Sequence, residues 1–195
     1  MRRDKRDEPV RLTRIYTRGG DGGETSLGDG ARVSKQHPLI RAFGAVDEVN
    51  SLVGLALAAL DLPPVLREGL APIQNELFDL GGDLSVPISD TRKQRTRVRD
   101  DQVARLERLC DELNEPLPGL TSFVLPGGTD AAARLHVARA ACRRAERETL
   151  AAHEELGVNP AALRYLNRLS DLLFIAARAA NAAAGRDEPL WKPGA

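Results

Sequence analysis

The sequence predicts an all-α protein, an antiparallel bundle of five amphipathic helices. Alanine and leucine dominate the apolar residues while aromatic residues make up only 4% of the chain, and this balance favours closely packed helices over sheets. After position 38, apolar residues recur every three or four positions in five separate stretches, which is the helical period. Mostly short links separate these stretches, so neighbouring helices are expected to run antiparallel.

The first two predicted helices span residues 38–61 and 65–83. Apolar residues at helical spacing run along the first as far as Leu60, and two consecutive prolines then end it. The second places leucine and isoleucine in strict four-three alternation, the strongest helix signal in the chain. Two of the few aromatic residues are expected on the packed faces of these helices, Phe43 on the first and Phe78 on the second.

The third helix is predicted over residues 100–114. The polar and basic stretch before it, residues 85–99, is too weakly apolar to pack, and we expect a loop whose order depends on a ligand or a neighbour. Pro116 and Pro118 stop the helix. A short apolar connector with a turn, residues 121–129, leads to the next helix.

The fourth and fifth helices are predicted over residues 130–154 and 160–184. Thr129 or Asp130 is expected to cap the fourth. The fifth begins with a proline and ends before a glycine. Small and apolar residues of the fourth helix step by three and four along one face that can pack, namely Leu135, Ala138, Cys142, Ala145 and Thr149.

A single domain accounts for the chain. At 195 residues, it is long enough to bury a full core without disulfides or a structural metal. We expect a flexible N-terminal tail at residues 1–11 and one helical domain over residues 12–193. Lys plus Arg equals Asp plus Glu, 28 each, so no global field indicates a nucleic acid or an anionic membrane as a partner.

The sequence favours a cytoplasmic location. No apolar run approaches the length that spans a membrane, and no apolar segment follows the charged N-terminus as it would in a secretion signal. Cys110 and Cys142 lie on the apolar faces of predicted helices and lack the paired spacing of a metal site. They are expected to be core thiols in a reducing compartment.

Three predicted helices place polar residues beside their packed faces, which is more than a simple bundle requires. These residues are His136, Arg139, Arg143 and Glu146 in the fourth helix, Asn167, Asp171 and Arg178 in the fifth, and Asp47, Asn50 and Ser51 in the first. A guanidinium half shielded from water attracts an anion more strongly than an exposed one. A cleft between helices or subunits would explain the pattern, and a solvated charged face with ion pairs is the plain alternative.

The segment before the first helix is rich in glycine, with six glycines in residues 19–30. Glycine lets a backbone approach a ligand closely and turn its N–H groups toward an anion, although a flexible surface loop has the same composition. The three histidines have no spacing that suggests zinc, and no Ser/His/Asp set can be assembled. Together with Lys35 and the Arg143, Arg144 and Arg147 cluster, the segment suits a polyphosphate, and this indicates nucleotide binding.

Five motifs in the same order over residues 12–193 closely resemble the PduO-type ATP:cob(I)alamin adenosyltransferases. They are TRGGDGGET at 17–25, DEVNS at 47–51, FVLPGG at 123–128, RAACRRAER at 139–147 and LNRLSD at 166–171. The resemblance implies a homotrimer of ferritin-like, cobalamin adenosyltransferase-like five-helix bundles, with active sites between neighbouring subunits. It implies an ATP:corrinoid adenosyltransferase of the cob(I)yrinic acid a,c-diamide type. Such an enzyme transfers the 5'-deoxyadenosyl group of ATP to cob(I)alamin, forming adenosylcobalamin and releasing triphosphate.

The resemblance also implies the residues of the site. The ATP-binding set would be Thr17, Arg18, Gly19, Gly20, Thr25, Lys35, Arg143, Arg144, Glu146, Arg147 and Asn167, with Arg143 as the catalytic residue. Asp47 and Arg139 match a pair that forms a salt bridge across the subunit interface near the corrinoid. Phe123 matches the residue that displaces the lower axial ligand of the corrinoid.

The reaction that the resemblance implies sets the expected cofactors and partners. Mg²⁺ would enter with ATP and be held mainly by the phosphates, without an all-protein metal site. A reductase that supplies cobalt(I) and a cobalamin-dependent mutase that receives the product are the expected protein partners.

Two other functional classes stay open on the residues alone. A phosphotransferase or nucleotide hydrolase would use the same arginines on a γ-phosphate and would release diphosphate instead of triphosphate. A non-enzymatic helical bundle would use the charges beside its packed faces only to fix the register of assembly, and ATP would not raise its melting temperature.

Overall fold

The computed structural model describes residues 16, 18–90 and 96–194. Within these residues the chain forms a two-stranded antiparallel sheet, β1 (Glu24–Ser26) and β2 (Arg32–Ser34), and five α-helices, α1 (Pro38–Leu57), α2 (Pro64–Leu84), α3 (Asp100–Asn114), α4 (Asp130–Leu156) and α5 (Pro160–Ala183). The prediction of a helical protein with five helices is therefore confirmed, and the sheet is a small addition to it. The predicted N-terminal tail, residues 1–11, and Thr17 lie outside the described residues. In the described part of the chain, no helix is long and apolar enough to cross a membrane.

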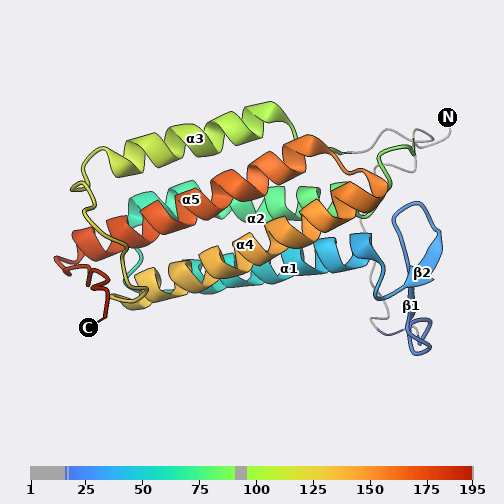
Figure 1. The fold of residues 1–195 in the computed structure, drawn as a ribbon, viewed down its shortest axis with the longest axis horizontal. Coiled ribbons are helices and arrows are strands. Elements are labelled where there is room, and N and C mark those ends of the chain that lie inside the picture. Colours follow the sequence, from blue (N-terminus) through green and yellow to red (C-terminus); the bar gives the residue numbers. More distant parts are fainter. Residues whose placement is uncertain (1–15, 17, 91–95, 195) are drawn as a thin grey trace, which may run out of the picture.

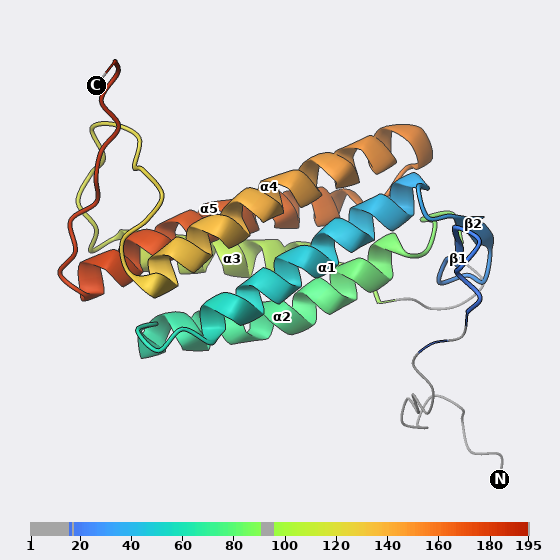
Figure 2. The ribbon, with the colours of Figure 1, turned by 90° about the horizontal axis from the view of Figure 1, so that it is seen from below.

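The helices form one elongated bundle, and the β-hairpin lies beyond the end at which α1 begins (Figure 1). α4 packs against both α1 and α5, α2 packs against α1, and α3 packs against α5. Figure 2 shows α4 alongside α1, and α1 alongside α2. α4, which carries the arginine cluster, therefore has a neighbouring helix on each side.

Consecutive helices run in opposite directions (Figure 1), as the short links predicted. The neighbours α3 and α5 are two steps apart in the chain and so run in the same direction. Arg164 pairs with Asp100 near the starts of these two helices at 2.6 Å, and Arg168 pairs with Glu107 further along both at 2.9 Å.

The helix ends follow capping chemistry. α1 and α5 begin with Pro38 and Pro160, at the first helical position, where the missing N–H has no helical partner to lose. Thr129 caps α4, because its Oγ1 accepts a hydrogen bond from the backbone N of Ala132 at 3.1 Å. α4 ends at Gly157, whose positive φ of 71° is a backbone conformation that glycine adopts without steric cost.

α1 ends at Leu57, earlier than the predicted end at residue 61. Arg67 of α2 donates hydrogen bonds to the carbonyl oxygens of Leu57 and, at 3.0 Å, of Ala59. These carbonyls are therefore satisfied without a further helical turn. Leu60, predicted on the packed face, lies beyond the helix and is fully exposed, so that prediction was wrong.

The two cysteines are free thiols and both are buried, as predicted for core residues. Burial raises the pKa of Cys110 to about 11 and raises the pKa of Cys142 further. Both thiols therefore stay protonated near neutral pH, which leaves them as packing residues.

Candidate active site

α4 buries one face and turns its arginines to the other side. The residues predicted to pack are all buried, namely Leu135, Ala138, Cys142, Ala145 and Thr149. Because successive helical residues turn by about 100°, Arg143 and Arg147 are directed away from that face and are exposed. Of the residues predicted to lie half shielded beside this face, Arg139 and Glu146 are partly buried, whereas Arg143 is exposed.

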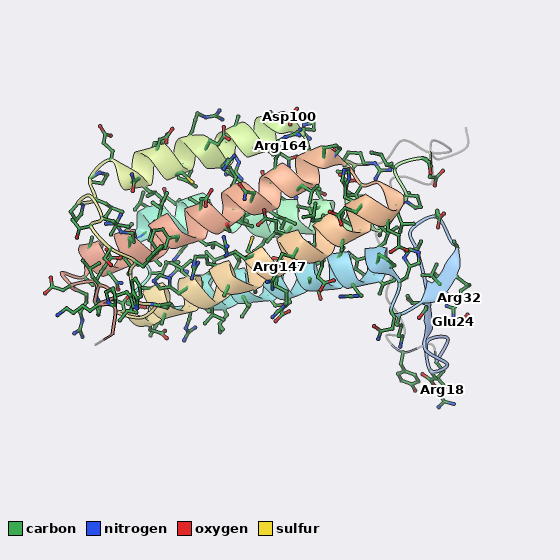
Figure 3. The ribbon with its side chains drawn as sticks, in the orientation of Figure 1. Arg18, Glu24, Arg32, Asp100, Arg147 and Arg164 are labelled. Atoms are coloured by element: carbon green, nitrogen blue, oxygen red, sulfur yellow. The ribbon has the colours of Figure 1, made fainter. Side chains whose placement is uncertain are left out.

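A hollow of about 500 Å³ lies where α4 meets α5. It is lined by Arg139, Ala140, Arg143, Glu146, Arg147 and Leu150 of α4 and by Asn167 of α5. We call it the arginine hollow. Figure 3 shows Arg147 part-way along α4. The fold thus gathers five of the predicted site residues from two helices in one place.

Asn167 connects the two helices at the edge of this hollow. Its Nδ2 donates to Oε1 of Glu146 at 2.9 Å, and its Oδ1 accepts from Nη1 of Arg168 at 3.0 Å. Arg168 also donates to Glu107 at 2.9 Å and to Asp171 at 3.2 Å. This chain of bonds fixes the orientation of the amide, and hence of the Glu146 carboxylate.

The arginines of the hollow are available for a ligand. In the described part of the chain, Arg139, Arg143 and Arg147 have no carboxylate partner, and Nε of Arg139 is buried without a hydrogen bond. Three guanidinium groups around one hollow repel one another, so an anion with several oxygens would stabilise them. The arrangement suits a polyphosphate.

Arg144 behaves differently from its neighbours. It forms an ion pair with Glu48 of α1, on the side of α4 away from α5, and does not line the arginine hollow. The structure therefore separates Arg144 from the other arginines of the predicted nucleotide set.

A second hollow, of about 640 Å³, adjoins the first. It is lined by Leu120, Thr121, Ser122, Phe123 and Val124 of the connector before α4, by Arg139 and Phe174, and by Trp191 near the C-terminus. We call it the aromatic hollow. Phe123 is 78% exposed and meets Trp191 edge-on, with the ring centroids 6.1 Å apart. Exposed aromatic rings beside a hollow offer contacts to a flat, largely apolar ligand.

The glycine-rich segment forms the β-hairpin and lines neither of these hollows. Arg18 lies beyond the bundle, far along the molecule from Arg147 (Figure 3). Thr25 lies in β1, and the carbonyl of Gly19 accepts a hydrogen bond from Arg32 at 2.7 Å. Lys35 lies close to Gly20, since a Cβ at Gly20 would be 3.2 Å from Nζ of Lys35. One chain therefore does not bring the loop to the arginines.

Asp47 lines neither of the two adjoining hollows. It is exposed on α1 and lines an apolar groove of about 410 Å³ between α1 and α2. Phe43 lines the same groove, as does Phe78, which was predicted on a packed face but is 71% exposed. Asp47 and Arg139 thus belong to different surfaces of one chain.

His136 was predicted half shielded at the edge of the arginine helix, but it is only 3% exposed. Its ring lies against Phe174, with centroids 6.2 Å apart, and neither ring nitrogen bonds to a described residue. Its pKa is lowered chiefly because burial disfavours the charged ring. The sequence reasoning also missed Phe174 and Trp191, although Trp191 is the only tryptophan in the chain.

Comparisons with known proteins identify the family of the chain. The family model of cobalamin adenosyltransferases matches residues 15–180. A cobalamin adenosyltransferase of Cupriavidus metallidurans is 47% identical over 182 residues, which cover 93% of this chain and 96% of that protein. A corrinoid adenosyltransferase of Bacillus subtilis is 41% identical, with 88% and 89% covered. A solved variant of the PduO-type ATP:corrinoid adenosyltransferase from Lactobacillus reuteri, complexed with cobalamin and ATP, has a TM-score of 0.88 at 37% identity, covering 92% of this chain and 97% of that one. The chain belongs to the cobalamin adenosyltransferase family.

Proposed function

We propose that this protein is an ATP:corrinoid adenosyltransferase, which transfers the 5'-deoxyadenosyl group of ATP to cob(I)alamin, forms adenosylcobalamin and releases triphosphate. The observation that carries the proposal is the meeting of two unlike hollows at Arg139. The arginine hollow suits a triphosphate, and the aromatic hollow suits a corrinoid ring. Relatives named corrinoid adenosyltransferase are 41% and 48% identical to this chain.

The chemistry needs little from the protein beyond position and charge. The cobalt(I) centre of the substrate supplies the electron pair for the new Co–C5' bond, and the C5'–O bond breaks as triphosphate leaves. Neither a protein nucleophile nor a general base is required. The protein aligns the two substrates and stabilises negative charge on the departing group. Arg143, in the arginine hollow, is the proposed catalytic residue.

We also propose a homotrimer of ferritin-like five-helix bundles with active sites between neighbouring subunits. Within one chain, none of the described ATP-binding residues proposed from the N-terminal segment lines the arginine hollow, and Arg18 lies far from Arg147. In a trimer, the loop of one subunit would reach the arginines of the next, and Asp47 would pair with Arg139 across the interface. The apolar groove beside Asp47, with its exposed Phe78, supports burial of that surface. The N-terminal residues concerned are Thr17, Arg18, Gly19, Gly20, Thr25 and Lys35.

Mg²⁺ is proposed to enter with ATP and to be held mainly by its phosphates. Glu146 and Asn167 lie at the edge of the arginine hollow, where a carboxylate and an amide can orient the water shell of the ion. Among the described residues, no three His, Cys, Asp or Glu side chains gather closely enough to hold a metal ion.

Protein partners and a cellular location are also proposed. A reductase must supply cobalt(I), and a cobalamin-dependent mutase is the proposed recipient of the product. A cytoplasmic location is proposed because Cys110 and Cys142 are free, buried thiols, as is usual in a reducing compartment.

Incubation with Mg-ATP and chemically reduced cobalamin tests the function. We expect the absorption spectrum of cob(I)alamin to change into that of an alkylcobalamin, with one triphosphate released per corrinoid consumed. Release of diphosphate without consumption of the corrinoid would indicate phosphoryl transfer instead. In the same samples, hydrogen exchange across residues 18–30 should slow when Mg-ATP binds, and unchanged exchange would remove the loop from the ATP site.

A further inference from the structure

The C-terminal segment, residues 186–191, lies alongside the connector that carries Phe123 (Figures 1 and 2). The backbone N of Trp191 donates to the carbonyl of Phe123 at 2.7 Å, and the backbone N of Leu125 donates to the carbonyl of Pro189 at 2.8 Å. We call this segment the C-terminal strap. Its position ties the end of the chain to one wall of the aromatic hollow.

A buried ion pair fixes the strap to α5. Arg178, only 4% exposed, donates from Nε to Oε2 of Glu188 at 3.0 Å and from Nη2 to the carbonyl of Pro118 at 2.8 Å. One guanidinium thus holds both the strap and the start of the connector. Charge-assisted bonds of this kind are strong, and removal of one partner leaves a buried charge unpaired.

Asn181, one turn further along α5, holds the other end of the connector. Its Oδ1 accepts from the backbone N of Thr129 at 2.9 Å, and its Nδ2 donates to the carbonyl of Gly127 at 3.2 Å. Gly128 has φ of 104°, and a Cβ at that position would collide with the Asn181 side chain. The backbone N of Arg186, the first residue of the strap, donates to the Asn181 carbonyl at 2.9 Å. Asn181 therefore holds the start of the strap as well as the connector.

We propose that the C-terminal strap positions the corrinoid. Trp191 forms one wall of the aromatic hollow and limits the movement of the Phe123 ring, while the Arg178–Glu188 pair holds strap and connector together. Trp191 contacts the corrinoid. Arg178 and Glu188 are positioning residues, because they hold Trp191 in place without contacting the corrinoid themselves. This role rests on the proposed function, because it takes the aromatic hollow as the corrinoid side of the active site.

The chain offers its own reporter for the strap, because Trp191 is its only tryptophan. In the full-length protein, Glu188→Ala should shift the Trp191 emission to longer wavelength and speed hydrogen exchange in residues 121–125. It should raise KM for cobalamin about tenfold, the loss expected for one charge-assisted contact. KM for ATP should change by less than about twofold, because the arginine hollow keeps its residues.

Asp100→Ala is the matched control. It removes the exposed Arg164–Asp100 pair, 2.6 Å long, near the hairpin end of the bundle (Figure 3), and it should leave emission, exchange and both KM values at wild-type levels. Unchanged emission and exchange in Glu188→Ala would show that the pair does not hold the strap. A loosened strap with an unchanged KM for cobalamin would overturn the positioning role.

A second variant keeps the proposal testable if Glu188→Ala unfolds. Trp191 is 47% exposed, so Trp191→Ala should keep the fold and the ion pair while raising KM for cobalamin. In the wild type, cob(II)alamin added with ATP should quench Trp191 fluorescence, because corrins absorb near the wavelength of tryptophan emission. Turnover without quenching would place the corrinoid elsewhere and reject the strap's role alone. Absence of turnover in the wild type would reject the proposed function and the strap's role together.

Discussion

Asn167 on α5 donates a hydrogen bond to Oε1 of Glu146 on α4, at 2.9 Å. Arg168 holds the opposite end of the same amide at 3.0 Å, so the amide cannot turn over without losing both bonds. Glu146 is therefore held by a neutral amide instead of by a neighbouring arginine. This leaves Arg143 and Arg147 free for an anion, although a carboxylate lies beside them in the same hollow.

Asn167→Asp should weaken ATP binding. The new carboxylate would face Glu146 at hydrogen-bonding distance, and the two like charges would repel each other and the phosphates. We expect KM for ATP to rise by about tenfold or more, equivalent to at least ~1.4 kcal/mol, with a smaller change in KM for cobalamin. Asn167→Ala is the control, because it removes the bond without adding charge and should raise KM for ATP less. A wild-type KM for ATP in Asn167→Asp would place the nucleotide elsewhere.

Arg143→Ala should nearly abolish turnover while the protein stays folded. The side chain is exposed and pairs with no described carboxylate, so it contributes little to stability. Removal of one contact to developing charge typically costs about 2–4 kcal/mol of activation free energy. Steady-state kinetics and thermal melting would measure both effects. The exposed Arg108→Ala on α3 should match the wild type, and near-normal kcat in Arg143→Ala at saturating substrates would contradict its catalytic role.

The arginine hollow could be predicted because most of it comes from one helix. Spacing along a helix fixes which residues share a face, so Arg139, Arg143, Glu146 and Arg147 could be grouped from the sequence. Helical spacing also placed Asn167 beside the packed face of the fifth helix, and the family resemblance then grouped it with these residues. Helix starts were equally accessible, since prolines and a threonine mark them.

Other features depend on contacts between distant parts of the chain, which no local pattern specifies. The Phe123 connector and Trp191 meet through backbone bonds between segments far apart in sequence. Leu60 was assigned to the core because its spacing was right, but Arg67 from the next helix satisfies the carbonyls at the end of α1. His136 was placed at an edge because no pattern showed that Phe174 would cover it.

His136 should make stability sensitive to acid. Its pKa is lowered, first by burial and then by Arg139, while Glu188 acts in the opposite direction. The folded state therefore binds fewer protons than the unfolded state, in which the ordinary value is 6.5. The resulting stability is fully present above pH 6.5 and is lost as the pH falls through the folded pKa.

Denaturant unfolding at several pH values would measure this effect as the free energy of unfolding. We expect the free energy of unfolding of the wild type to be constant near neutral pH and to fall as the pH is lowered. In His136→Gln, the free energy of unfolding should depend less steeply on pH over the same range. Parallel curves for the two proteins would show that another group causes the acid sensitivity.

Phe123→Ala should lower turnover far more with cobalamin than with cobinamide. Phe123 is 78% exposed beside the aromatic hollow, so it stabilises the bundle little, and its ring is proposed to lie below a bound corrin. There it is proposed to displace the lower base, which makes cobalt(II) easier to reduce to the nucleophilic cobalt(I) state. Cobinamide has no lower base, so the variant should lose less with that substrate. The ratio of the two kcat values, measured beside the melting temperature, separates this role from packing. Equal losses with both corrinoids, together with a lower melting temperature, would make Phe123 a packing residue.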